Sequence, residues 1–174
     1  MCPSISCHFG MLDPLATARN WRGALARHLT RLDLGSRLDR FFTPAPDRTI
    51  RDYVAGAAPI FVVTAERGGD VCGVAEVHPH HNRPSAAEIA VSVDEDLRRR
   101  GIGRALFSRA LAEAQARGIE DIWVVYLRGN EAMGRIADRA GFASVAGDDP
   151  GTITAHLIDF APMSGGVAAG AEES

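Results

Sequence analysis

The chain has 174 residues, of which 46% are hydrophobic and 24% charged, and its formal net charge is -3. The length suits one domain with a real hydrophobic core, and the charge excludes the general basic field of a nucleic-acid-binding protein. No apolar run approaches the roughly 18 residues of a membrane span, and the N-terminus lacks the pattern of a signal peptide. We therefore expect a cytoplasmic protein with neither nucleic-acid nor membrane partners.

The first third of the chain carries helical periodicity. Residues 1–12 show no regular pattern, and we expect a flexible N-terminus there. Residues 13–32 place apolar side chains at helical spacing, after an aspartate-proline pair that suits a helix start. Two shorter helices are predicted over residues 35–42 and 47–57, with prolines between them.

Strand patterns begin near the middle of the chain. Residues 59–65 form a dense β-branched run, and a glycine-containing turn separates them from a partner strand over residues 71–78. A loop is expected over residues 79–85, and a third strand over residues 87–93. Cysteine is sparse, at Cys2, Cys7 and Cys72, without the spacing of a disulfide framework or a zinc site, so no metal is expected.

The second half alternates between helix and strand. A long amphipathic helix is predicted over residues 101–117, followed by the segments 121–127 (strand), 130–140 (helix), 142–146 (strand) and 152–160 (strand). The order predicts an α/β (α+β) domain over residues 13–161, with a mixed central sheet and helices on both faces. The small-residue tail, 162–174, is expected to be disordered.

The most informative segment is the turn between the third strand and the long helix. It reads Arg98-Arg99-Arg100-Gly101-Ile102-Gly103. A strand that leads into a helix N-terminus offers free N–H groups and a positive dipole end, which suit a phosphate group. No lysine follows the glycines, as a Walker loop requires, and Leu106 stands where a dinucleotide-binding fingerprint has its third glycine. The chemistry therefore indicates a diphosphate site of another kind.

Two further segments carry patterned residues on either side of that turn. Residues 87–93 read Ala-Glu-Ile-Ala-Val-Ser-Val, and the later helix begins at Asn130, carries Met133 and ends in a Gly-Phe pair. Together with the Arg-x-x-Gly-x-Gly turn, these segments resemble the GNAT superfamily of N-acetyltransferases, most specifically over residues 88–142. Within it, they look most like the GNAT domain of bacterial Pat-type protein lysine acetyltransferases.

The resemblance implies acetyl-CoA as cosubstrate and assigns residues to its binding. In such proteins the sheet splays after the strand that ends at Val93, which frees the N–H groups of Val91 and Val93 for the pantetheine arm. The diphosphate then lies on the turn, and the asparagine of the next helix contacts the arm or a nearby main-chain group. The cosubstrate-binding residues expected on this basis are Val91, Val93, Arg98, Arg99, Arg100, Gly101, Ile102, Gly103, Arg104, Asn130 and Met133.

The reaction also needs a base for the amine, and Glu88 is the candidate. A carboxylate acting directly or through water can deprotonate an ammonium group, although a glutamate at the start of a strand is often only solvated or salt-bridged. Glu76, on the neighbouring strand, is the weaker candidate. Many GNAT enzymes place a tyrosine acid where this chain has Ala137. Tyr126 lies near in sequence, but its direction is not predicted.

Other residues admit several readings. Three interpretations are open for His78, His80 and His81. In the first they lie in an exposed loop without a role, in the second they line the site near the acceptor amine, and in the third, the least favoured, they bind a metal. Trp21 and Trp123 are expected in the core.

The function predicted from these residues is acetyl transfer to a primary amine, either a protein lysine or a small molecule. The alternatives are a non-catalytic acyl-CoA-binding sensor and a transferase for an acidic acyl group. A homodimer is compatible with the resemblance.

Overall fold

The computed structural model describes residues 7–12, 21–80, 83–145 and 149–157. Within them, seven strands form one mixed sheet in the order β1-β2-β3-β4-β5-β7-β6. The strands are β1 (His8–Leu12), β2 (Phe61–Arg67), β3 (Asp70–His80), β4 (Arg83–Val93), β5 (Asp121–Leu127), β6 (Phe142–Val145) and β7 (Thr152–Leu157).

The α-helices of the described chain are α1 (Trp21–Arg31), α2 (Leu34–Phe41), α3 (Asp47–Gly56), α4 (Ile102–Ala116) and α5 (Glu131–Arg139). A short 3-10 helix, Glu95–Leu97, leads from β4 toward α4. None of the helices within the described ranges is long and apolar enough to cross a membrane.

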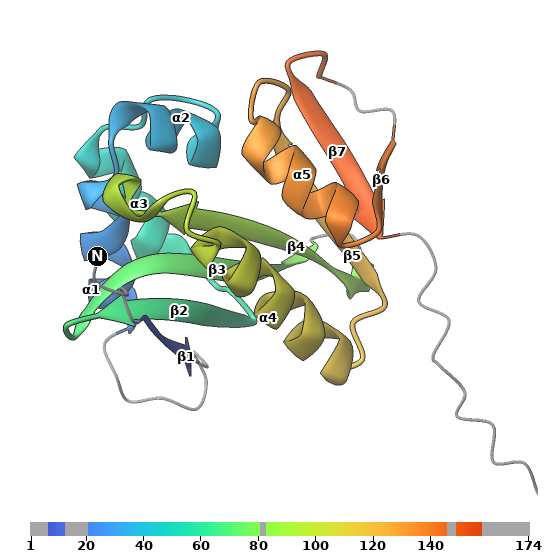
Figure 1. The fold of residues 1–174 in the computed structure, drawn as a ribbon, viewed down its shortest axis with the longest axis horizontal. Coiled ribbons are helices and arrows are strands. Elements are labelled where there is room, and N and C mark those ends of the chain that lie inside the picture. The colour runs from blue at the N-terminus through green and yellow to red at the C-terminus, as the bar shows by residue number, and fades with distance from the viewer. Residues whose placement is uncertain (1–6, 13–20, 81–82, 146–148, 158–174) are drawn as a thin grey trace, which may run out of the picture.

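All neighbouring strands pair antiparallel except β4 and β5, which are parallel and connected through α4. Figure 1 shows that α5, β5, β6 and β7 form a second group set at an angle to strands β1–β4. The mixed sheet with helices on both faces is therefore confirmed.

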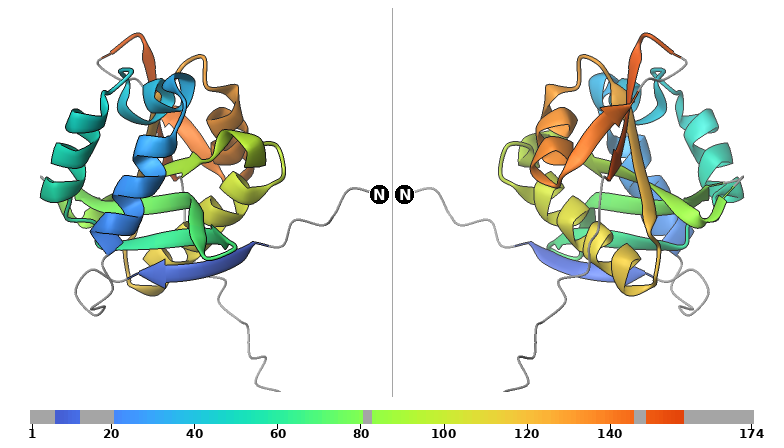
Figure 2. Two further views of the ribbon diagram at one scale, coloured as in Figure 1. Left: turned by 90° about the vertical axis from the view of Figure 1, so that its left-hand side faces the viewer. Right: turned by 90° about the vertical axis from the view of Figure 1, so that its right-hand side faces the viewer.

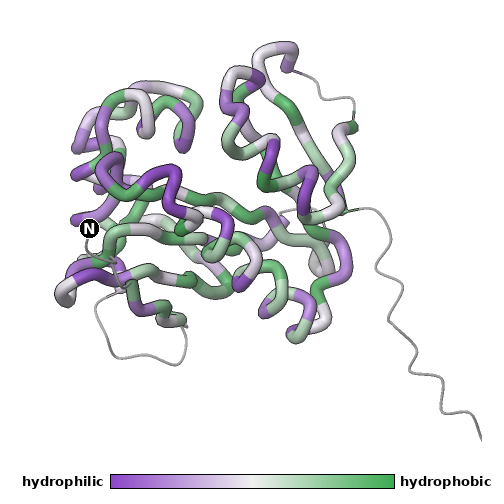
Figure 3. The backbone as a smooth tube through the Cα atoms, in the orientation of Figure 1, coloured by the Kyte–Doolittle hydropathy of each residue, from purple (hydrophilic) through white to green (hydrophobic). Residues whose placement is uncertain are grey.

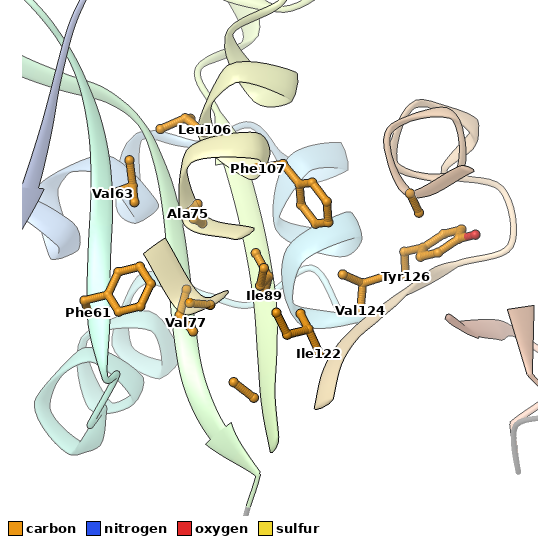
Figure 4. Close-up of a cluster of buried hydrophobic side chains, with 14 of the residues drawn as sticks. Phe61, Val63, Ala75, Val77, Ile89, Leu106, Phe107, Ile122, Val124 and Tyr126 are labelled. Carbon is orange, nitrogen blue, oxygen red and sulfur yellow. The ribbon is translucent and has the colours of Figure 1, made fainter. Parts of the chain in front are cut away.

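The two faces of the sheet bury separate cores because side chains alternate along a strand. On β3, Ala75 and Val77 belong to one core, and Val74 belongs to the other. Helix α4 covers the first face, where Leu106 and Phe107 point toward the strands (Figure 4). Helices α1 and α3 cover the second face, as the two side views in Figure 2 show.

Several predicted boundaries need correction. Residues 8–12 are not flexible but form β1, which pairs with β2 from His8↔Glu66 to Leu12↔Val62. The predicted loop over residues 79–85 is wrong, because β3 continues to His80 and β4 already begins at Arg83. Helix α1 is described only from Trp21, so the expected start at residue 13 lies outside the described residues. The end of the last strand, beyond Leu157, and the tail lie outside them too.

The remaining elements match the predictions closely. Helix α4 begins one residue later than expected, β5 has the predicted bounds, and α5 is one residue shorter at each end. Trp21 lies in the core with 5% exposure, as expected. Trp123 does not, since it is only half-buried and stacks on the His156 ring with centroids 4.4 Å apart.

Candidate functional site

Strands β4 and β5 separate part of the way along their length. They pair only over Ala86↔Asp121, Ala87↔Ile122 and Glu88↔Trp123, although β4 continues to Val93. Beyond Glu88, β4 has no strand partner on that side among the described residues. A strand edge exposes N–H and C=O groups that need partners, so this edge is suited to hold an extended ligand.

A cleft of about 830 Å³ opens beside this edge. It lies between the end of β4, the start of α4, helix α5 and helix α2. Its lining residues are Ser36, Asp39, Val91, Ser92, Val93, Arg98, Arg99, Arg100, Gly101, Gly103, Arg104, Asn130, Ala132, Met133, Arg135, Ile136 and Arg139. The structure thus brings together all the residues predicted for cosubstrate binding except Ile102, whose side chain is 7% exposed and packs in the core. Only the backbone of Ile102 can reach a ligand.

The N-terminus of α4 faces this cleft with N–H donors that have no acceptor within the helix. Gly101 has φ of 82°, a left-handed conformation that favours glycine, and it supplies no side-chain cap. The first intrahelical bond runs from the Ala105 N–H to the Gly101 carbonyl, so the N–H groups before Ala105 have no helical acceptor. Gly103 does not have positive φ, and a Cβ there would lie 3.7 Å from Val93 and Ile136 side-chain atoms.

Arginine charge surrounds these donors. Figure 3 shows the strongly hydrophilic turn between β4 and α4 beside the hydrophobic central strands. Arg98 is paired with Asp33, which also caps α2 by accepting the Ser36 N–H at 3.0 Å. Within the described chain, no carboxylate pairs with Arg99, Arg100 or Arg104.

The end of β4 is fixed from the other face of the sheet. Buried His28, on α1, lies with Nε2 2.9 Å from Ser92 Oγ and with Nδ1 3.0 Å from Asp94 Oδ1. Arg31 also pairs with Asp94 at 2.8 Å. Burial would raise the pKa of Asp94, but the contacts with His28 and Arg31 outweigh it and lower the pKa. An ionised Asp94 therefore helps to hold the segment that leads into the arginine turn.

Helix α5 supplies the other wall of the cleft. The Asn130 side chain accepts the Met133 N–H at 3.0 Å, so it caps α5 in this structure. Arg135 and Arg139 also line the cleft, although the sequence analysis did not select them. Their four-residue spacing puts them on one face of the helix, and that spacing is the signal that could have identified them. Ala137 is fully buried and supplies no acid.

Glu88 lies at the point where β4 and β5 separate. It is half-buried and stands directly opposite His78 on β3 and in register with Trp123 on β5. In the part of the chain that the structure describes, its carboxylate has no hydrogen-bond or ion-pair partner. It does not line the arginine-rich cleft itself, but it ends the paired segment from which that cleft opens.

Glu76 cannot act as the alternative base. Its side chain is fully buried and pairs with Arg40 at 2.6 Å, while Tyr53 Oη lies 2.9 Å away and His78 Nε2 lies 3.3 Å away. Burial would raise the pKa of Glu76, but the charge of Arg40 and the contacts of His78 lower it to about 2. A carboxylate whose pKa is this low is a weak base and therefore a poor proton acceptor.

The remaining candidates are placed as follows. His78 and His80 belong to β3 rather than to a loop, and His81 lies outside the described residues. No group of three metal-ligating side chains occurs among the described residues.

Tyr126 is 4% exposed and lies beneath α5, on the opposite face of β5 from the residue paired with Glu88 (Figure 4). It is therefore not directed at Glu88.

Comparison with known proteins agrees with this geometry. A profile of the Acetyltransferase (GNAT) family matches residues 26–142. No protein with a curated description matches the sequence.

Several solved structures share the fold. The GNAT domain of S. lividans PAT superposes with a TM-score of 0.72 at 19% identity, covering 86% of this chain and 89% of that one. A putative acetyltransferase from Salmonella typhimurium, solved with acetyl-CoA, gives a TM-score of 0.63 at 20% identity, with 87% and 93% coverage. A ribosomal-protein-alanine N-acetyltransferase from Brucella melitensis gives 0.59 at 21% identity, with 79% and 95% coverage. With the family profile spanning most of the described domain, the chain belongs to the GNAT family and is an N-acetyltransferase.

Proposed function

We propose that acetyl-CoA binds along the free edge of β4, with its diphosphate on the N-terminus of α4. The observation that carries this proposal is the junction of a strand edge that β5 leaves unpaired with a helix start that has no side-chain cap. The N–H groups of Val91 and Val93 serve the pantetheine arm, and those of Arg99 to Arg104 serve the diphosphate. Arg99, Arg100 and Arg104, which pair with no carboxylate of the described residues, favour a multiply charged anion beside these donors.

Glu88 is the general base in this account. It lies where the two strands part, so an acetyl group at the inner end of the arm comes close to it. Its carboxylate takes a proton from the acceptor ammonium, and the free amine then attacks the thioester carbon. The CoA thiolate leaves without a tyrosine acid, because Ala137 occupies that position in the core. A thiolate is a tolerable leaving group near neutral pH, which makes this step feasible.

The acceptor is a primary amine, and two classes of acceptor are tested together: amines of proteins and amines of small molecules. The name of one structural neighbour, the ribosomal-protein-alanine N-acetyltransferase, motivates protein acceptors. Small amines form the second class. The panel therefore contains single-lysine peptides, a polyamine, free amino acids and an aminoglycoside.

The test combines calorimetric titration of acetyl-CoA with an assay of free-thiol release on this panel. We expect binding by the wild-type chain and thiol release that depends on one class of amine. Glu88→Gln is expected to bind acetyl-CoA equally well and to lower kcat/KM by about 10² to 10⁴-fold, the usual contribution of a general base. Absence of binding contradicts the proposed cleft, whereas full activity of Glu88→Gln contradicts only the base.

A further inference from the structure

A buried polar cluster lies next to Glu88, and the reaction described so far does not use it. Arg40 of α2 donates to Glu76 Oε1 at 2.6 Å and to Tyr53 Oη at 2.7 Å. Tyr53 Oη lies 2.9 Å from Glu76 Oε2 and 3.1 Å from His78 Nε2. His78 Nε2 lies 3.3 Å from the same Glu76 oxygen. Two oxygens, one from α3 and one from β3, therefore contact the same imidazole nitrogen.

The positions of the protons in this cluster follow from the available donors and acceptors. Arg40 only donates, and the ionised carboxylate of Glu76 only accepts. The single Tyr53 proton goes to Glu76, its nearer partner, because Arg40 already donates to the hydroxyl oxygen. His78 Nε2 must then carry a hydrogen to satisfy Glu76 and Tyr53. This assignment leaves Nδ1 of the neutral imidazole as an unprotonated acceptor.

The imidazole lies beside the candidate base. His78 and Glu88 are direct cross-strand partners in the antiparallel β3–β4 pair, so both side chains lie on the same face of the sheet. Side chains in such positions have Cβ atoms about 4.5 to 5.5 Å apart. The His78 side chain is 24% exposed, and within the described residues no group bonds to its Nδ1. Water can therefore reach an acceptor nitrogen close to Glu88.

We propose that His78 accepts at Nδ1 the proton that Glu88 removes from the acceptor ammonium, and passes it to solvent. The inference rests on the proposed function, since it requires Glu88 to be the base. In sequence, the ammonium loses one proton to Glu88, and protonated Glu88 transfers it to His78. The amine attacks the thioester carbon, the carbon–sulfur bond breaks, and the departing thiolate takes the second nitrogen-bound proton. Imidazolium then releases the first proton to water.

The charges that face His78 favour this role. Glu76 on β3 and Glu88 on β4 are carboxylates, and Tyr53 on α3 contributes a neutral hydroxyl. Arg40 on α2 is the cation of the cluster, but its charge is compensated by Glu76 at 2.6 Å. His80 follows two residues later on the same strand. The imidazolium that forms during the reaction is stabilised by the carboxylate of Glu88, which is ionised again after the transfer, and by the Glu76 oxygen next to its Nε2.

The first test compares single and double variants with acetyl-CoA and the first amine of the panel that supports thiol release. His78→Gln retains an N–H donor for Glu76 and Tyr53 but has no titratable nitrogen. We expect it to lower the kcat/KM for the amine by about tenfold and to remove one ionisation from its pH profile, with the KM for acetyl-CoA unchanged. The double variant with Glu88→Gln should be no slower than Glu88→Gln alone, because both residues act on the same proton.

The matched control is His156→Gln, which changes another half-buried histidine that contacts a carboxylate, Asp121, at 2.5 Å. It lies on β7, and β5 separates it from β4. We expect the wild-type pH profile from this variant. Independently of any variant, ¹⁵N chemical shifts of the wild-type histidines should show His78 protonated at Nε2 when neutral.

The relay is overturned by an unchanged rate and pH profile of His78→Gln, by additive effects in the double variant, or by an Nδ1-protonated neutral form of His78. Each of these leaves the proposed acetyl transfer intact. In contrast, a wild-type chain that binds acetyl-CoA but releases no thiol with any amine contradicts the proposed function itself. The two failures are thus distinguished by the behaviour of the wild type.

Discussion

The site has two halves that are built in opposite ways. The donor half, residues 89–104 with the facing side of α5, presents a strand edge, N–H groups without helical acceptors, and three arginines (Arg99, Arg100 and Arg104) that have no carboxylate partner within the described chain. The acceptor half consists of Glu88 with Arg40, Tyr53, Glu76 and His78, and all its charges except that of Glu88 are compensated inside the protein. The first half is therefore completed by a ligand, whereas the second is already ordered without one.

This difference predicts separate consequences for changes in each half. Variants in the donor half should change the affinity for acetyl-CoA and leave folding nearly intact. Variants in the buried cluster should change the free energy of unfolding or the rate of transfer and leave acetyl-CoA affinity nearly intact.

The largest effect is expected from Glu76→Ala. It leaves the Arg40 guanidinium buried without its carboxylate, since the Arg40 side chain is only 11% exposed. Breaking a buried ion pair in this way costs about 3 to 5 kcal/mol of unfolding free energy. Urea denaturation of the wild type and the variant measures this loss of unfolding free energy. Asp96→Ala is the control, because it removes the exposed pair with Arg67 and should cost less than about 1 kcal/mol. Equal losses in the two variants would contradict the account of the cluster.

The same cluster should make stability depend on acid pH. Burial would raise the pKa of Glu76, but Arg40 and His78 outweigh this effect and lower the pKa from 4.5 to about 2. A lowered folded-state pKa contributes stability that is present above the unfolded value and lost as the pH falls toward the folded value. At about 1.4 kcal/mol per pKa unit, the loss is about 3 kcal/mol. Relative to Glu76→Gln, wild-type stability should therefore fall below pH 4.5, and parallel curves would exclude this contribution.

In the donor half, Gly101→Ala should weaken acetyl-CoA binding by about tenfold. The backbone there has φ of 82°, and a non-glycine residue in that conformation costs about 1 to 2 kcal/mol, which shifts the turn that aims the N–H groups. Gly129→Ala is the control, since Gly129 lacks positive φ and has open space around it. Calorimetry should show weaker acetyl-CoA binding only for Gly101→Ala. A similar loss of affinity in both variants would indicate that the backbone conformation at Gly101 is not needed for binding.

The smallest effect concerns Arg139, which lines the cleft without a carboxylate partner in the described chain. Arg139→Gln should weaken acetyl-CoA binding by about threefold, as expected for one exposed charge. Because this contribution is electrostatic, the loss should shrink as the salt concentration rises. Arg48→Gln on α3, where the side chain is 93% exposed, is the control. An equal loss in the two variants would contradict a direct contribution of Arg139 to acetyl-CoA binding.

The same contrast explains how much the sequence could predict. The donor half is a continuous strand, turn and helix, and α4 and β5 matched their predicted bounds to within one residue. The acceptor half joins residues 23 to 36 positions apart, and no local pattern reveals that Arg40 meets Glu76 or that Tyr53 meets Glu76. The sequence therefore offered Glu76 as an alternative base, although its tertiary contacts bury it and make it a weak base. Strand β1 was missed for a related reason, because the residues of β2 that pair with it are 50 to 58 positions away in the chain.

The central claim, that the free edge of β4 and the start of α4 bind acetyl-CoA, is tested most directly by amide hydrogen exchange with and without the cosubstrate. If acetyl-CoA binds there, amide exchange at residues 89–93 and 99–104 should slow when acetyl-CoA is added, with little change at β2 and α3. Protection confined to other parts of the sheet, or no protection at saturating acetyl-CoA, would contradict it.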